Sequence, residues 1–165
     1  MTLPRQMTIS IGADHGGVVL KDALKHEIAL MGHSVIDRGT QGTASVDYPD
    51  FAERVGHDIQ SGAADFGVLV CTTGIGISIS ANKMPGIRAA LVYNEDGARY
   101  SRLHNNANVI CFGAKYHTPY WAAQLTKLFL STDYERGRHQ PRLEKLEHLL
   151  HSSVSKSSNS LPNDA

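Results

Sequence analysis

The residues with the clearest chemical potential lie between Phe66 and Asn82, where an apolar run ends in a cysteine and a short turn containing glycine. Cys71 ends the run, and the turn Thr72-Thr73-Gly74-Ile75-Gly76 follows it. A strand that passes through such a turn into a helix directs several backbone N–H groups toward one point, which attracts an anion. A thiolate at Cys71 would be stabilised by the same positive field. The stretch therefore predicts a base and an oxyanion site within one turn.

Further candidate side chains stand near the predicted ends of strands and helices. Asp14 and His15 follow the first apolar run, His104 lies in a polar string, and Arg138 and Arg142 are four residues apart. Taken singly, each has a plainer explanation as a capped turn, a solvated helix end or a charged surface. Histidine also suits acid catalysis near neutral pH, and two guanidinium groups at this spacing can converge on a phosphate. Both interpretations remain open for these residues.

Apolar runs typical of strands alternate along the chain with segments of helical periodicity. Strands are predicted at 7–12, 34–37, 66–71, 87–92 and 108–112, and helices at 18–31, 47–61, after Gly76, at 94–103, at 118–130 and from Pro141 onward. This alternation predicts an α/β fold with a five-stranded parallel sheet and helices on both faces. Ligands bind such sheets beyond the carboxyl ends of the strands, where Asp14, His15 and the Cys71 turn fall.

Length and composition narrow the class of protein. The 165 residues predict a single domain at 7–151, with a flexible segment at 1–6 and a disordered Ser/Asn-rich tail at 152–165. A formal net charge of zero argues against nucleic acid or a membrane as partner. No secretory signal is recognisable, and the two cysteines suggest neither a disulfide framework nor a metal site. We therefore expect a reduced, cytoplasmic protein without a metal or cofactor.

Six motifs occur in order between about Thr8 and about Leu150. They are Gly12-Ala-Asp-His-Gly-Gly17, Asp47-Tyr-Pro49, Cys71-Thr-Thr-Gly-Ile-Gly-Ile-Ser-Ile-Ser-Ala-Asn-Lys83, Pro85-Gly-Ile-Arg-Ala89, Ser101-Arg-Leu-His-Asn105 and Gly137-Arg-His-Gln-Pro-Arg142. Together they resemble ribose-5-phosphate isomerase type B, a family that also includes galactose-6-phosphate isomerase subunits. The resemblance implies a Rossmann-like α/β/α sandwich and a homodimer or dimer of dimers with shared active sites. It also implies metal-independent interconversion of D-ribose 5-phosphate and D-ribulose 5-phosphate through a cis-enediolate.

The same resemblance assigns roles to individual residues. It makes Cys71 the proton-shuttling base, His104 the acid that assists ring opening, and Thr73 a further catalytic residue of the turn. The residues implied to bind the substrate are Asp14, His15, Tyr48, Thr72, Gly74, Ile75, Gly76, Asn105, Lys115, Arg138 and Arg142.

Two departures from the family pattern bear on the choice of substrate. Thr72 stands where a glycine is common, and Lys115 stands where an arginine is frequent. The alternatives are therefore allose 6-phosphate, galactose 6-phosphate or a tetrulose phosphate as substrate. A phosphate-binding module without catalytic activity is a further alternative.

Overall fold

The computed structural model describes residues 5–154, with side chains as far as Leu149. Five strands form one parallel sheet in the order β2-β1-β3-β5-β4, which confirms the predicted α/β fold. The strands are β1 (Thr8–Ala13), β2 (Ser34–Asp37), β3 (Phe66–Cys71), β4 (Ala89–Leu91) and β5 (Val109–Gly113). The helices are α1 (Val18–Leu30), α2 (Tyr48–Gln60), α3 (Ile75–Ala81), α4 (Glu95–Leu103), α5 (Pro119–Leu130), the 3₁₀ turn η1 (Gly137–His139) and α6 (Gln140–Val154).

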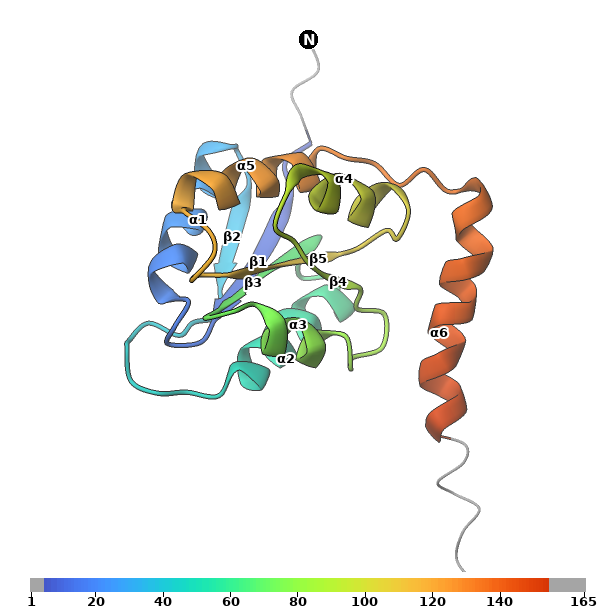
Figure 1. Ribbon diagram of the computed structural model, residues 1–165, viewed down its shortest axis with the longest axis horizontal. Coiled ribbons are helices and arrows are strands. Elements are labelled where there is room, and N and C mark those ends of the chain that lie inside the picture. The colour runs from blue at the N-terminus through green and yellow to red at the C-terminus, as the bar shows by residue number, and fades with distance from the viewer. Residues whose placement is uncertain (1–4, 155–165) are drawn as a thin grey trace, which may run out of the picture.

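The sheet is covered on both faces, because the central strands β3 and β5 are apolar along their whole length. Figure 1 shows α1, α4 and α5 on one side of the sheet and α2 and α3 on the other. One buried cluster, which includes Leu24, Ile110 and Phe129, fills the first side. A second cluster, which includes Val55 and Leu69, fills the other. These two cores fix the ends of β1, β3 and β5 relative to one another.

Two of the helices, α4 and α5, begin at residues whose side chains cap them. The Asn94 side chain accepts a hydrogen bond from the Gly97 amide at 2.8 Å before α4, and Thr118 accepts one from the Trp121 amide at 3.2 Å before α5. The fourth strand is shorter than the predicted 87–92. It begins only at Ala89, because the Arg88 amide donates a hydrogen bond to the Asn108 side chain at 2.8 Å and not to a neighbouring strand.

The last helix stands to one side of the sandwich, next to the edge strand β4 (Figure 1). Buried Leu143 and an ion pair of 2.8 Å between Arg88 Nη1 and Glu147 Oε1 hold α6 to the body. The helix runs three residues past the predicted domain end at 151. The predicted disordered tail beyond Val154, and most of the predicted flexible segment 1–6, lie outside the described residues. Within the described residues, no helix combines the length and apolar character needed to cross a bilayer.

Candidate active site

Three strands end side by side at the carboxyl edge of the sheet. In register, Ala13 of β1 lies opposite Val70 of β3, and Cys71 of β3 lies opposite Gly113 of β5. The chain connections leave β1 and β3 in opposite directions along the sheet, so this edge is the topological switch point where α/β sheets bind ligands. The segments that begin at Asp14, Thr72 and Ala114 therefore meet there, as expected from the sequence.

The turn after β3 is fixed around the sulfur of Cys71. The Gly74 N–H donates a hydrogen bond to Cys71 Sγ at 3.1 Å, and the Ile75 N–H donates to Thr73 Oγ1 at 3.4 Å. A donor aimed at the sulfur stabilises negative charge on it. Only 4% of the Cys71 surface is exposed, so the sulfur lies at the bottom of the turn. The Gly74 amide is thus directed at the sulfur, which leaves the amides after it as the candidate oxyanion donors.

Gly74 is the position at which this turn requires glycine. Its φ of +78° lies in the left-handed region, where a side chain is disfavoured. A methyl group at this position would also lie 2.6 Å from Leu91 Cδ1 and 2.8 Å from the Gly113 nitrogen. The close approach of the turn to the end of β5 therefore depends on the absence of a side chain.

The loop after β1 supplies Asp14 and His15. Asp14 is buried, and its Oδ1 accepts a hydrogen bond from the Gly16 N–H at 2.9 Å. The exposed His15 accepts at Nδ1 from the Val46 N–H at 3.2 Å, so its Nε2 carries the proton and can donate to a ligand. One carboxylate and one imidazole are thus fixed beside the cysteine turn.

Neighbouring side chains complete this edge. The ring of Tyr48 lies against Gly76, where a methyl group would come within 2.6 Å of Tyr48 Cζ. The hydroxyl of Thr72 lies directly over Gly16. The threonine at this position therefore fills space between the loop after β1 and the turn after β3. The exposed Lys115 is tied to the same turn through its N–H, which donates to the Thr72 carbonyl at 3.0 Å.

The remaining predicted site residues lie at the opposite edge of the sheet. His104 ends α4, and Asn105 belongs to the segment that leads into the amino end of β5. The His104 ring stacks on His139 with centroids 4.2 Å apart, which brings Arg138 and Arg142 into the same region. The length of β5 separates this edge from the Cys71 edge by about 15 Å. The structure therefore divides the predicted residues of one chain into two groups.

This second group is rich in positive charge. Arg138 Nε donates to His139 Nε2 at 3.4 Å, and Glu135 approaches His139 Nε2 at 3.5 Å and His104 Nε2 at 3.7 Å. Burial lowers the pKa of His139, and the neighbouring His104 and Arg138 lower it further against the opposing effect of Glu135. The exposed Arg138 and Arg142 then remain available to bind an anion such as a phosphate.

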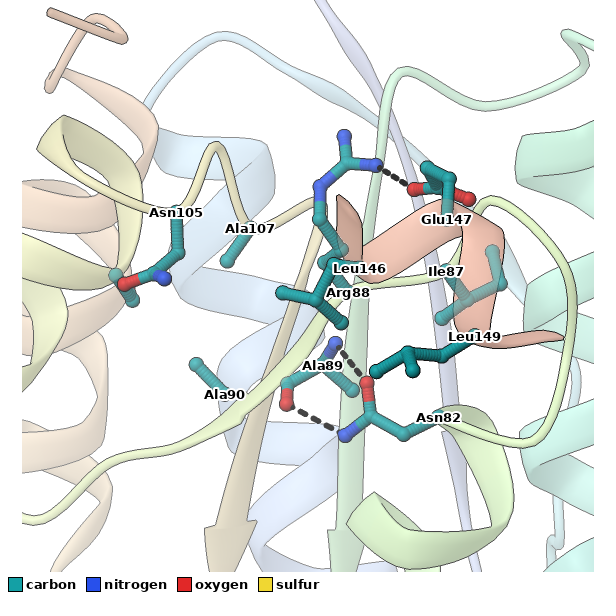
Figure 2. A pocket seen from close by; sticks show the side chains of 11 residues that line it. Asn82, Ile87, Arg88, Ala89, Ala90, Asn105, Ala107, Leu146, Glu147 and Leu149 are labelled. Carbon is teal, nitrogen blue, oxygen red and sulfur yellow. Dashed lines mark hydrogen bonds and ion pairs between the residues drawn. The ribbon is translucent and has the colours of Figure 1, made fainter. Parts of the chain in front are cut away.

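Asn105 also lines a groove between the body and the last helix. The groove has a volume of about 440 Å³, and Figure 2 shows Leu146 and Leu149 of α6 projecting toward Ala89 and Asn82. Its walls are mostly apolar, so it resembles a packing surface more than a sugar site.

Cys111 lies at neither edge of the sheet. It is fully buried in the second core cluster, and burial raises the pKa of its thiol, with a further contribution from Cys71. This agrees with the predicted role of Cys111 in packing. Neither Glu135 nor His139 was predicted as a site residue, although His139 lies within the Gly137–Arg142 motif.

Comparison with known proteins places these residues in a family. Residues 9–146 match the family model described as Ribose/Galactose Isomerase. The relative named ribose-5-phosphate isomerase B from Escherichia coli is 40% identical over 84% of this chain and 93% of its own length. The galactose-6-phosphate isomerase subunit LacB from Clostridium acetobutylicum is 39% identical over 84% of this chain and 80% of its own length. A solved structure of ribose-5-phosphate isomerase B from Clostridium thermocellum superposes with a TM-score of 0.88 and 42% identity, covering 89% of this chain and 99% of its own.

Proposed function

The chain belongs to the Ribose/Galactose Isomerase family, and from this premise we propose that it interconverts D-ribose 5-phosphate and D-ribulose 5-phosphate. The observation that carries the proposal is the sulfur of Cys71, which lies 3.1 Å from the Gly74 amide nitrogen at the carboxyl edge of the sheet. A thiolate held by a main-chain donor is a suitable base, whereas phosphate binding alone does not require a thiol.

The proposed reaction moves one proton between adjacent carbons. The Cys71 thiolate takes the proton from C2, and the electron pair that is left behind forms the enediolate as charge develops on O1. The proton then returns from sulfur to C1 while the O2 hydroxyl proton passes to O1, so no atom is gained or lost. The Gly76 amide, joined by that of Ile75 once it leaves Thr73 Oγ1, stabilises the charged oxygens, a contribution typically worth about 3–4 kcal/mol per donor.

The proposed site is completed by a second copy of the chain. Asp14, His15 and Cys71 belong to one edge of the sheet, whereas His104 and Arg138 belong to the other. Two antiparallel copies related by a twofold axis would bring opposite edges together twice. His104 of one copy would then protonate the ring oxygen of a sugar whose C2 faces Cys71 of the other. Arg138 and Arg142 would hold the distant phosphate and orient the open chain.

A related phosphorylated aldose is the second candidate substrate. Thr72 fills space beside Gly16 at the proposed sugar site, and one relative that covers most of this chain is a galactose-6-phosphate isomerase subunit. At position 115 this chain has a lysine where an arginine is frequent in the family, and a lysine offers a phosphate a point charge in place of a forked contact. The relative is the reason to test hexose 6-phosphates beside the pentose, and the residues at positions 72 and 115 are the places where the site can differ between these substrates.

The experiment is to incubate the purified protein with ribose 5-phosphate and follow the formation of ketose, with and without a chelator. A panel of allose 6-phosphate, galactose 6-phosphate and a tetrulose phosphate, compared by kcat/KM, then identifies the preferred substrate. We expect ribose 5-phosphate to give the highest value. Failure to exchange solvent deuterium into any of these sugars would instead favour a phosphate-binding module without catalytic activity.

A further inference from the structure

Two histidines and a glutamate form a compact cluster at the amino edge of the sheet. Glu135 Oε2 lies 3.7 Å from His104 Nε2 and 3.5 Å from His139 Nε2. All three side chains offer a donor atom within 4.8 Å of the other two, and the structure describes one such group of three among residues 5–149. The cluster lies outside the cysteine turn and uses two residues, Glu135 and His139, that have no role in the proposed reaction.

The backbone holds the three residues together. The Glu135 N–H donates to the Leu103 carbonyl at 3.0 Å, which fixes Glu135 beside the residue that precedes His104. Arg136 has a φ of +65°, and the chain turns there so that His139 returns onto the His104 ring. A non-glycine residue in this region costs free energy, so the turn is maintained by the surrounding contacts. The cluster therefore arises from the fold and does not depend on flexible surface side chains meeting by chance.

The donor set is that of a transition metal. Two imidazoles and one carboxylate bind zinc in many sites that keep a fourth position open. Tetrahedral zinc with bonds near 2 Å requires about 3.3 Å between neighbouring donor atoms. The two observed N···O separations exceed this value by a few tenths of an ångström. We propose that His104, Glu135 and His139 form a binding site for a divalent ion of the zinc class, with an open position that water occupies.

Two features set the conditions for binding. The rings of His104 and His139 are nearly parallel, with an interplanar angle of 16°, so one ring must rotate for both nitrogens to face the same ion. The Arg138 guanidinium, which donates to His139 Nε2, must also leave that nitrogen. The half-exposed Glu135 carboxylate supplies the negative charge that offsets this cation, and it gives the ion a route from solvent. The site should thus bind zinc reversibly and should ignore Mg²⁺, which prefers oxygen ligands.

A metal ion bound at this site would inhibit the enzyme. A metal ion bound at Nε2 of His104 uses the lone pair of that nitrogen, so the nitrogen can no longer carry the proton that ring opening requires. Zinc would therefore act as a reversible inhibitor of ring opening. This consequence rests on the proposed function, whereas metal binding itself does not.

The test uses the full-length protein after removal of metal with a chelator. Co²⁺ is added as a spectroscopic probe, and Zn²⁺ is then used to displace it. The variants are Glu135→Gln, which alters an exposed side chain of equal size, and His139→Gln. His57→Gln is the matched control, because His57 lies 3.4 Å from Glu53 on the surface and belongs to no group of three histidine, cysteine or carboxylate ligands among residues 5–149. Cys71→Ala tests for a thiolate ligand, and unfolding curves check that each variant is folded.

We expect one equivalent of Co²⁺ to give visible absorption bands in the unchanged protein, in His57→Gln and in Cys71→Ala. Affinity should fall at least about tenfold in Glu135→Gln and in His139→Gln. The zinc concentration that halves the rate, measured relative to the metal-free rate of each variant, should rise by a similar factor in Glu135→Gln. Absent binding, bands unchanged in Glu135→Gln, or a thiolate charge-transfer band lost in Cys71→Ala would each overturn the proposal. Metal binding without isomerase activity would overturn the proposed function alone.

Discussion

Replacement of Gly74 by alanine tests the turn that holds the cysteine. The φ of +78° alone costs a non-glycine residue about 1–2 kcal/mol. The added methyl group would lie 2.6 Å from Leu91 Cδ1 and 2.8 Å from the Gly113 nitrogen, and overpacking of this kind costs about 1–3 kcal/mol. The free energy of unfolding should therefore fall by about 2–5 kcal/mol in Gly74→Ala.

Gly86→Ala is the matched control for this substitution. Gly86 has a φ of +74°, and no atom lies within 4 Å of a methyl group built there. It should therefore lose only the backbone contribution, about 1–2 kcal/mol. Urea unfolding at equilibrium measures both variants, and the difference between them isolates the steric effect at the end of β5. Equal losses in the two variants would refute the packing described for the cysteine turn.

The same pair of variants reports on catalysis. If the Gly74 amide holds the sulfur of Cys71, displacement of the turn should lower kcat more than it changes KM. Gly86→Ala should retain both values. A Gly74→Ala enzyme with the kcat of the unchanged protein would show that the amide does not support the base.

Three further predictions concern the proposed base, the phosphate contact and acid stability. Cys71→Ala should abolish isomerisation and solvent deuterium exchange while sugar-phosphate binding is retained, and near-normal turnover would remove Cys71 from the mechanism. Arg142→Ala should mainly raise KM for the phosphorylated sugar. An unchanged KM would show that Arg142 is a solvated surface residue that does not contact the phosphate. Burial alone would raise the pKa of Asp37, but hydrogen bonds from Lys25, Lys21 and the Gly39 amide lower it well below its ordinary value. Because the folded pKa is depressed, the stabilisation by Asp37 is complete above about pH 4 and is lost as the pH falls further. The difference in unfolding free energy between the unchanged protein and Asp37→Asn should shrink in that range, and a difference independent of pH would contradict this account.

The sequence was sufficient to predict the sheet and the cysteine turn. The apolar run 66–71 lacks polar alternation because both faces of β3 are covered, and this property is visible in residue types alone. The order Cys71, two threonines and Gly74 likewise indicates a strand followed by a tight turn. Strand ends were less predictable, since the late start of β4 depends on the Asn108 side chain twenty residues away.

The arrangement of the site across the two edges was not predictable in the same way. Asp14, His15 and Cys71 follow strands directly, so the rule for parallel sheets places them together. His104 instead ends the helix after β4, and because that helix runs back along the sheet, its end lies at the opposite edge. The contact between His104 and His139 depends on the turn at Arg136, whose positive φ has no signal in the residue type.

We propose one active site that takes Cys71 from one copy and His104 from another. The most direct measurement mixes two inactive variants, Cys71→Ala and His104→Asn, after dissociation and reassembly of the subunits. In a mixed dimer one site carries both substitutions and the other carries neither, so random pairing should restore about a quarter of the sites. Recovery of isomerase activity near that fraction is the predicted result. A reassembled mixture that stays as inactive as its two components would contradict the shared site.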